Sequence, residues 1–286
     1  MNRISRTQMH RSIRDAVVLI ALALSAAAHA LAQDTGASQQ QPPDHSVSAN
    51  VAVVTDYMFR GITQTWGHRA IQGGGDLTMQ NGFAAGFWAS SISERSYPGG
   101  AMELDLYGSY GANFNDDWSW RVSLYGYVYP SADLDRSRPR LASRSFNTLE
   151  ANGALTWKWL TLKYSRSLSD YFAIDTEQGY DGDSRGTGYL QLDAGWPLSD
   201  AWTLSLHAAH TDIPARLLTT AGSLDPSYGD FGATLKYQLS TRWSASAGAT
   251  AATNRTFFAH TVSLLDPAET KNIAGRRGFV MLQGTF

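Results

Sequence analysis

The chain has 286 residues, no cysteine and a formal net charge of −2. The lack of cysteine excludes disulfides and thiolate metal sites. The near-neutral charge gives no basis for nucleic-acid binding, which needs a basic patch. Charged residues make up only 17% of the chain, against 26 glycines, 13 tyrosines and 9 tryptophans. This composition favours β-strands that present aromatic and small side chains.

The N-terminus has the pattern of a secretory signal. Four arginines precede the apolar run "AVVLIALALS" at 16–25, which is too short to cross a bilayer. The small residues "ALA" at 30–32 predict cleavage before Gln33, so residues 1–32 are expected to be a cleaved signal peptide. An uncleaved anchor is the alternative. Residues 33–45 have no apolar period and are expected to form a flexible periplasmic lead-in.

From residue 46 onward, apolar and polar side chains alternate strictly. In "MELDLYGSYGA" at 102–112, Leu104 and Leu106 share one face, while Glu103 and Asp105 share the other. A helix would place Glu103 and Leu106 on the same side, so the pattern favours a strand. Such segments are expected at 46–60, 70–79, 82–92, 101–112, 118–129, 146–157, 159–168, 187–196, 201–211, 228–239, 242–252 and 276–286.

The connections between these segments alternate between short and long. Short turns such as "QNG" at 80–82 and "PLSD" at 197–200 contrast with the long connections 130–145 and 253–275. Strands of about 10 residues, with short turns on one rim and long loops on the other, are typical of an outer-membrane barrel. The sequence therefore predicts an all-β fold, a single transmembrane antiparallel β-barrel of about 12 strands. It would occupy residues 46–286, with short periplasmic turns and long extracellular loops.

A soluble β-sandwich would also alternate and is the main structural alternative. Two observations favour the barrel. Aromatic side chains gather at strand ends, where a membrane barrel has its girdles: Tyr57, Phe59, Trp118, Trp120, Trp157, Trp196, Trp202 and Trp243. The opposite face is polar, and its charged residues of both signs are expected to line a lumen: Asp56, Arg60, Glu103, Asp105, Arg121, Glu150, Lys163, Asp193 and Lys236.

The last predicted strand, "RRGFVMLQGTF", ends on Phe286 and carries Val280 and Leu282 on the same face. A C-terminal aromatic residue resembles the signal by which the outer-membrane barrel assembly machinery recognises its clients. Phe286 is therefore expected to be an assembly signal.

The stretch "TDYMFRGITQT" at 55–65 concentrates reactive side chains near one strand end. Continued alternation would place Tyr57 and Phe59 outward, in the girdle, and Asp56 and Arg60 inward at the mouth. Aspartate beside arginine is far more often a structural ion pair than a catalytic pair. In lumen water such a pair adds about 0 to 1 kcal/mol of stability. We therefore expect an Asp56–Arg60 ion pair that shapes the field at the mouth.

This stretch, followed by "AIQGG" at 70–74, resembles the N-terminal signature of the TorF-type porins, also called the Gcw_chp family of Gram-negative bacteria. The segments "ELDLYGSYG" at 103–111, "YVYPSA" at 127–132 and "WLTLKYSRSLSDYF" at 159–172 resemble its later blocks. The resemblance covers nearly all of the chain after residue 32. It implies a secreted outer-membrane β-barrel and carries over no catalytic residues.

Two other chemistries have weaker support. Outer-membrane lipases and acyltransferases place serine and histidine together at the rim. Ser205 and His207 share the inward register, but their spacing also matches the period of any polar strand face. Four acidic residues could donate oxygens to calcium: Asp175, Glu177, Asp181 and Asp183. They lack the spacing of a known calcium loop, so neither a metal nor a cofactor is expected.

The sequence thus predicts a non-enzymatic porin of the cell outer membrane, through which small hydrophilic solutes diffuse along a mixed-charge lumen. The mixed signs argue against strong ion selectivity. The alternative is a closed structural or ligand-binding barrel that acts through its long loops. A barrel of twelve strands is narrow, and inward side chains such as Tyr107 and Tyr125 could close it. The expected partners are outer-membrane lipid, lipopolysaccharide and the barrel assembly machinery, with no nucleic acid.

Overall fold

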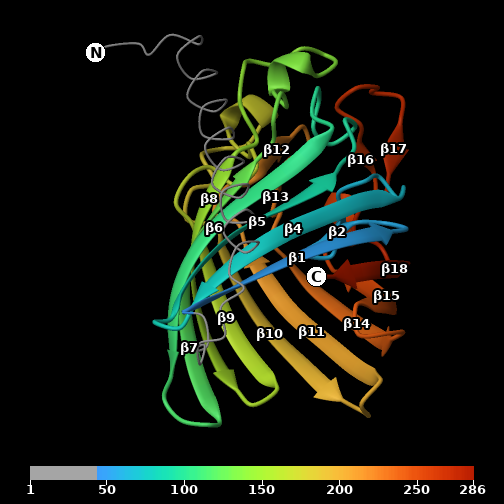
Figure 1. Ribbon diagram of the computed structural model, residues 1–286. Coiled ribbons are helices and arrows are strands. Elements are labelled where there is room, and N and C mark those ends of the chain that lie inside the picture. The colour runs from blue at the N-terminus through green and yellow to red at the C-terminus, as the bar shows by residue number, and fades with distance from the viewer. Residues whose placement is uncertain (1–43) are drawn as a thin grey trace, which may run out of the picture. The chain divides into compact units, whose positions relative to one another are not determined.

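The computed structural model describes residues 44–286, so the predicted signal peptide and residues 33–43 of the lead-in lie outside the described residues. Twelve antiparallel strands of the described chain form one closed barrel (Figure 1). They are β1 (His45–Val54), β4 (Ala70–Met79), β5 (Phe83–Ser91), β6 (Met102–Asn113), β7 (Trp118–Val128), β8 (Thr148–Trp157), β9 (Leu160–Ser167), β10 (Gly188–Pro197), β11 (Trp202–Asp212), β14 (Tyr228–Gln238), β15 (Trp243–Ala252) and β18 (Arg277–Thr285). Each pairs with its neighbour in the chain, and β1 pairs with β18 to close the barrel. The predicted barrel is confirmed.

Short elements lie in the long loops. They are β2 (Met58–Phe59), β3 (Ile62–Thr63), β12 (Leu217–Thr219), β13 (Gly222–Leu224), β16 (Thr261–Val262), β17 (Thr270–Lys271), the 3-10 turns η1 (Leu134–Arg136) and η2 (Thr176–Gln178), and the helix α2 (Arg255–Phe258). No helix within residues 44–286 is long and apolar enough to cross a membrane.

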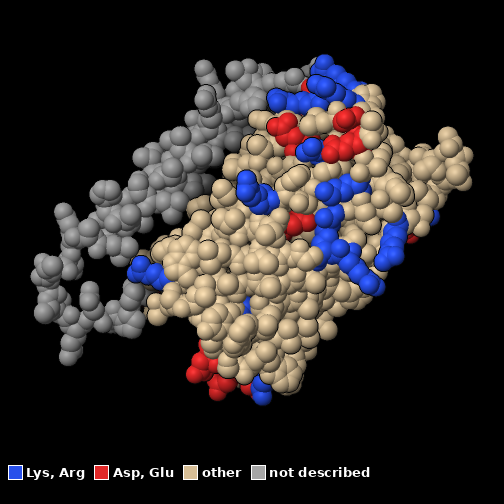
Figure 2. Space-filling model, turned by 90° about the vertical axis from the view of Figure 1, so that its right-hand side faces the viewer, with Lys and Arg blue, Asp and Glu red and all other residues tan. Residues whose placement is uncertain are grey.

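Alternation along the sequence sets the register of the barrel. Every predicted strand except the first agrees with the observed strand within two residues at each end. The outer face exposes large apolar side chains, including Ile71 at 67% and Val280 at 57%, while Glu103 on the inner face is fully buried. Figure 2 shows the same division on one side of the molecule, where a broad band almost free of charge separates charged ends. This outer surface is that of a transmembrane barrel.

A belt of aromatic side chains follows the short-turn rim. Ring centroids lie 6.3 Å apart for Trp118 and Trp157, and 5.1 Å apart for Trp159 and Trp196. Trp202 continues the belt, with its ring 4.6 Å from that of Tyr237. These tryptophans are exposed on the outer face, at the level where membrane barrels carry an interfacial girdle.

The chain end completes this belt. Phe286 is 56% exposed and its ring lies 6.3 Å from that of Trp243. Its backbone exchanges two hydrogen bonds with Ala49 on β1, of 2.8 and 2.9 Å. The last residue therefore helps to close the seam between the first and last strands.

Candidate functional site

The barrel interior is the candidate site, and its side chains come from alternate positions of neighbouring strands. Every predicted lumen residue that lies on a strand falls on the inner face: Glu103, Asp105, Arg121, Glu150, Lys163, Asp193 and Lys236. They divide into two groups. Arg121 and Lys236 are exposed, and Lys163 and Asp193 are partly exposed. Glu103, Asp105 and Glu150 have 9% or less of their surface exposed. The lumen thus has a hydrated half toward the short turns and a filled half toward the long loops.

The first loop, residues 55–69, fills this second half. Tyr57, Gln64 and Trp66 are buried at 8%, 5% and 2% exposure. The backbone turns inward at Arg60 and Gly61, whose φ angles of 48° and 75° lie in the left-handed region. A side chain at Gly61 would also come within 2.7 Å of the β-carbon of Asp230 on β14. The β2–β3 hairpin therefore lies inside the barrel.

The first predicted strand was expected to run to residue 60, but β1 ends at Val54. The girdle positions predicted for Tyr57 and Phe59 are therefore wrong. The Tyr57 ring lies 5.2 Å from that of Trp88 on the inner face of β5, and the Phe59 ring lies 5.6 Å from that of Tyr127. Both rings pack inside the barrel because the alternation stops where the loop turns inward.

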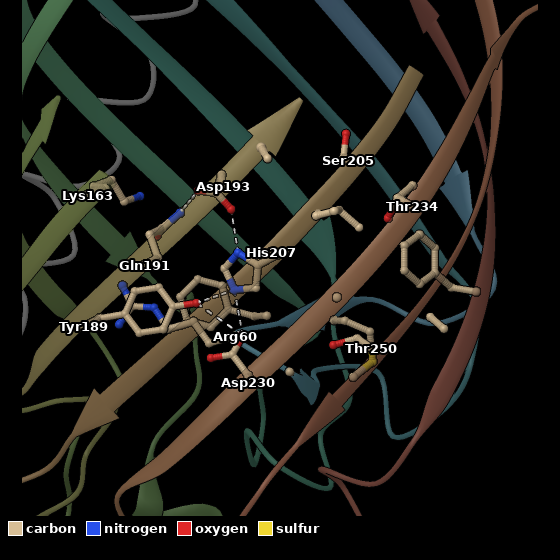
Figure 3. Close-up of a pocket in the computed structure, with 18 of the residues that line it drawn as sticks. Arg60, Lys163, Tyr189, Gln191, Asp193, Ser205, His207, Asp230, Thr234 and Thr250 are labelled. Atoms are coloured by element: carbon tan, nitrogen blue, oxygen red, sulfur yellow. Dashed lines mark hydrogen bonds and ion pairs between the residues drawn. The ribbon is translucent and has the colours of Figure 1, made fainter. Parts of the chain in front are cut away.

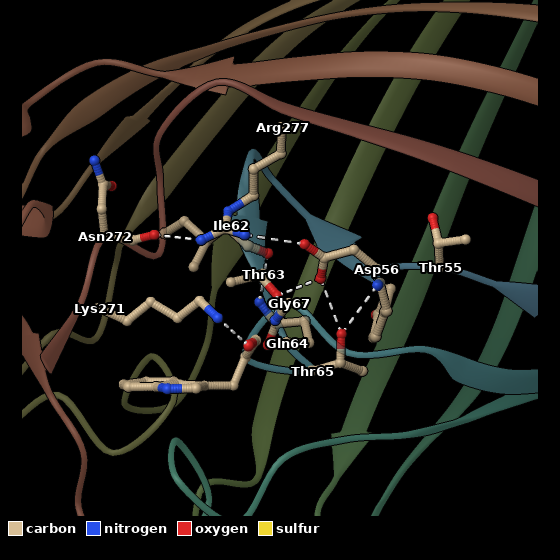
Figure 4. Close-up of polar contacts among 12 residues, drawn as sticks. Thr55, Asp56, Ile62, Thr63, Gln64, Thr65, Gly67, Lys271, Asn272 and Arg277 are labelled. Carbon is tan, nitrogen blue, oxygen red and sulfur yellow. Dashed lines mark hydrogen bonds and ion pairs between the residues drawn. The ribbon is translucent and has the colours of Figure 1, made fainter. Parts of the chain in front are cut away.

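Asp56 holds the first loop in shape (Figure 4). Its carboxylate accepts hydrogen bonds from the hydroxyls of Thr63 and Thr65 and from Nη1 of Arg277, the last at 3.2 Å. The Thr65 hydroxyl also accepts from the backbone N–H of Tyr57. The predicted Asp56–Arg60 ion pair is therefore wrong. Asp56 pairs with Arg277 at the start of β18, because the inward turn carries Arg60 away to another wall of the barrel.

Substitution of Asp56 by asparagine should loosen the first loop. The amide loses the charge that faces Arg277, and a hydrogen bond to a charged group contributes about 1.5–3 kcal/mol. Backbone amides of residues 57–66 should then exchange with deuterium roughly ten to a hundred times faster. Mass spectrometry of the refolded barrel would measure this. Asp116→Asn, in an exposed short turn, is the control and should leave the exchange unchanged. Equal exchange in D56N and wild type would contradict the role of Asp56.

Arg60 reaches from the first loop to the far wall of the barrel. Its Nη1 and Nη2 donate to Oε1 and Oε2 of Glu150 at 2.9 and 2.7 Å, and Nη1 also donates to the Tyr171 hydroxyl at 3.1 Å. The guanidinium lies 4.0 Å from the centroid of the Tyr189 ring. Bidentate arginine–carboxylate pairs and cation–π contacts are strong when desolvated. Through these contacts Arg60 attaches the first loop to β8 and β10.

The charge of Arg60 is kept despite burial. Its side chain and that of Glu150 are 5% and 1% exposed. Burial by itself lowers the pKa of Arg60, but the oxygens of Tyr171 and Glu150 outweigh this effect and raise the pKa above its usual range. Arg60 therefore stays charged in its buried contact with Glu150.

A cavity of about 540 Å³ lies under Arg60 (Figure 3). On its wall, His207 bridges two carboxylates, with Nδ1 2.5 Å from Oδ1 of Asp193 and Nε2 2.8 Å from Oδ1 of Asp230. The Tyr189 hydroxyl lies 3.0 Å from the same Nε2. Both ring nitrogens are thus engaged, and neither is free to take a proton from Ser205. This geometry argues against the hydrolase alternative.

The long loops cover the mouth with a shared apolar core. Tyr97, Tyr129, Leu134, Phe146 and Ala173 are buried together, and Phe59, Phe172 and Leu264 pack against them. Rings stack within this core, with the centroids of Tyr97 and Tyr129 4.5 Å apart. The long loops are therefore a folded cap.

The acidic loop 175–186 belongs to this cap. Asp175 accepts a hydrogen bond of 2.7 Å from Nε of Arg144, and Asp181 accepts one of 2.7 Å from the backbone N–H of Arg216. Across residues 44–286, no group of three or more His, Asp or Glu side chains is placed to hold a metal ion. The acids tie neighbouring loops together.

Glu103 and Asp105 occupy a separate pocket of the filled half. Glu103 is fully buried, and neither of its carboxylate oxygens makes a hydrogen bond of ordinary geometry. Tyr57 and Tyr129 are polar neighbours. No ion pair of the described chain involves either acid. These two residues face inward as predicted but are sealed from lumen water by the first loop and the cap.

Comparison with known proteins identifies a sequence family and several barrels. The Gcw_chp family, described as bacterial protein of unknown function, matches residues 37–273. No curated protein matches the sequence. The chain is similar to the KdgM porin, with 10% identity over 84% of this chain and 99% of that chain and a TM-score of 0.47. It is similar to the NanC porin, with 8% identity over 84% and 98% and a TM-score of 0.47. It is also similar to the COG4313 outer membrane channel from Pseudomonas putida F1, with 9% identity over 88% and 99% and a TM-score of 0.44.

The family match confirms the Gcw_chp part of the resemblance noted in the sequence. The description of the family names no activity, so the TorF-type porin label stays a prediction. Function is therefore argued from the lumen of this chain.

Proposed function

This chain belongs to the Gcw_chp family of bacterial proteins, and we propose that it is an outer-membrane channel for the passive diffusion of small hydrophilic solutes. The observation that carries the proposal is the hydrated half of the lumen. There Arg121 and Lys236 face inward and are exposed, and Lys163 on the same inner surface lines the cavity under Arg60. A polar, hydrated interior inside an apolar wall is the arrangement of a membrane channel.

The first loop sets the narrowest level of this channel. Arg60 crosses the interior to Glu150, and its guanidinium lies 4.9 and 4.0 Å from the ring centroids of Phe59 and Tyr189. Solutes would have to pass this level, so the channel is expected to have a small conductance that depends on how firmly the loop is held.

The same proposal fixes the orientation and the surroundings of the barrel. Residues 1–32 would be removed on export, the short turns would face the periplasm, and the long loops would face outward. Outer-membrane lipid and lipopolysaccharide would surround the apolar wall, where Val53 and Leu282 are 51% and 47% exposed. The barrel assembly machinery would recognise Phe286 at the final strand.

Single-channel recording tests the proposal directly. Refolded protein of residues 33–286 should give stepwise currents in a planar bilayer. Gly195 lines the cavity, and a side chain there would meet no atom within 4 Å, so Gly195→Trp should narrow the lumen and lower the conductance. Gly153 has equally open space but lies on the outer face of β8. Gly153→Trp is therefore the matched control and should conduct like wild type.

The cap supports a second candidate, a closed barrel that binds a ligand through its long loops. Its apolar core joins several loops and would hold a fixed outer surface. A protein that inserts and shifts on gels after heating, yet never conducts, would favour this candidate and overturn the channel.

A further inference from the structure

The acidic side chains of the lumen are mostly neutralised or sealed. Glu150 is paired with Arg60, and Asp56 with Arg277. Glu103 and Asp105 are buried in their own pocket. These contacts remove four of the inward carboxylates from the water-filled half.

Asp193 and Asp230 share His207. Both ring nitrogens can donate to carboxylates only when the imidazole is protonated, so the network carries one net negative charge. Asp230 is 1% exposed, and the other oxygen of Asp193 accepts a hydrogen bond from Gln191. Asp76 is then the remaining partly exposed acid of the lumen wall, and it accepts a hydrogen bond of 2.6 Å from the Tyr107 hydroxyl.

Three inward bases form no ion pair within the described chain: Arg121, Lys163 and Lys236. Arg121 and Lys236 are exposed near the short-turn rim, on β7 and β14. Lys163 lies deeper on β9 and lines the cavity under Arg60. Its electrostatic neighbours Glu150 and Asp193 are already held by Arg60 and His207. A solute that enters from the short-turn rim therefore meets unpaired positive charge at two successive levels.

We propose that the channel prefers small anions, so that its natural solutes are small organic acids carrying carboxylate or phosphate groups. The inference rests on the proposed diffusion function and names its substrate class. Among the groups that face lumen water, the three unpaired bases outnumber Asp76 and the single net charge of the His207 network. The preference is moderate, because the excess is one charge.

Acidic residues of the short turns do not cancel this preference. Asp116, Asp117 and Asp200 are exposed at the rim, and Lys158 pairs with Asp117 at 3.4 Å. Charges facing bulk solution are screened within about 8 Å at physiological salt, so these acids and the rim bases Arg121 and Lys236 all act over a short range. Lys163, inside the lumen wall, is screened less.

The reversal potential of single channels in a KCl gradient tests the inference. Wild type should be more permeable to chloride than to potassium. Lys163→Gln and Lys236→Gln should each lower the chloride-to-potassium ratio by about two- to sixfold. One unit charge roughly 8 Å from the pore axis in water acts on the two ions with opposite signs, and salt screening reduces its effect toward the lower value. Asp76→Asn should raise the ratio by a similar factor.

Arg166→Gln is the matched control. Arg166 is three residues from Lys163 on the same strand, but it lies on the outer face and is exposed there. R166Q removes the same charge from the protein and should leave the ratio unchanged. A wild-type channel that conducts but prefers potassium, or one in which K163Q and R166Q behave alike, overturns the inference and leaves the channel standing. A barrel that never conducts overturns both.

Discussion

Replacement of Glu150 by glutamine should release the first loop from the barrel wall. Arg60 would stay buried without a carboxylate, and breaking a buried pair in this way costs about 3–5 kcal/mol. That free energy changes the ratio of inward to released loop by a factor of roughly 10² to 5 × 10³. Trypsin should then cleave E150Q after Arg60, a bond that is buried in wild type. Release of the loop should widen the lumen and so raise the conductance in bilayer recordings.

Glu269→Gln is the control for this variant. Nε of Arg95 donates to both oxygens of Glu269 at 2.8 and 2.7 Å, so this is also an arginine–glutamate pair that engages both carboxylate oxygens. The side chains of Arg95 and Glu269 are 40% and 36% exposed. An exposed pair contributes about 0–1 kcal/mol. E269Q should therefore leave Arg60 protected. Protection of Arg60 in E150Q as well would show that Glu150 does not hold the loop, whether or not the protein conducts.

The strands could be predicted because a strand repeats every two residues. Glu103 and Leu106 fall on opposite faces only in a strand, and the pairing of β6 with β7 keeps that assignment along the sheet. Short turns and long loops follow once the strands are located. Nothing beyond local sequence is needed for this part of the fold.

The first loop could not be predicted in the same way. Arg60 and Glu150 are 90 residues apart, and no local pattern indicates that they meet. The available signal was local: Gly61 permits the inward turn, and Thr63 and Thr65 follow Asp56 at a spacing that allows both hydroxyls to reach its carboxylate. Extending the strand alternation past Val54 overrode this signal and placed Tyr57 and Phe59 outside.

The sequence also could not predict which levels of the lumen are open to water. Alternation places Glu103 and Lys163 on the same inner surface, yet one is fully buried and the other lines a cavity. The difference comes from which loops pack against each level of the wall. That packing depends on contacts between distant loops, such as the Tyr97 and Phe146 rings at 5.2 Å.

Replacement of Glu103 by glutamine should stabilise the barrel, in contrast to the effect at Glu150. Glu103 is fully buried, pairs with no base of the described chain and lies beside a second acid, Asp105. An unsatisfied buried polar group costs about 1–3 kcal/mol, and more when it is charged. Glutamine has nearly the same shape and stays polar, but it removes the carboxylate charge and its repulsion with Asp105, so the gain is the charge-dependent part of this cost. The free energy of unfolding at pH 7, from urea titration in lipid vesicles, should rise by about this amount.

Asp76→Asn provides the comparison. Asp76 also lies on the inner face, but it is partly exposed and accepts a hydrogen bond from Tyr107. D76N should change the free energy of unfolding by no more than about 1 kcal/mol. Destabilisation of E103Q would mean that the carboxylate has a stabilising partner in the membrane. Glu103 and Glu150 lie on the same inner surface, and only 0% and 1% of their surface is exposed. Opposite effects of the same substitution would therefore show that the partner, rather than the depth of burial, determines what each contributes.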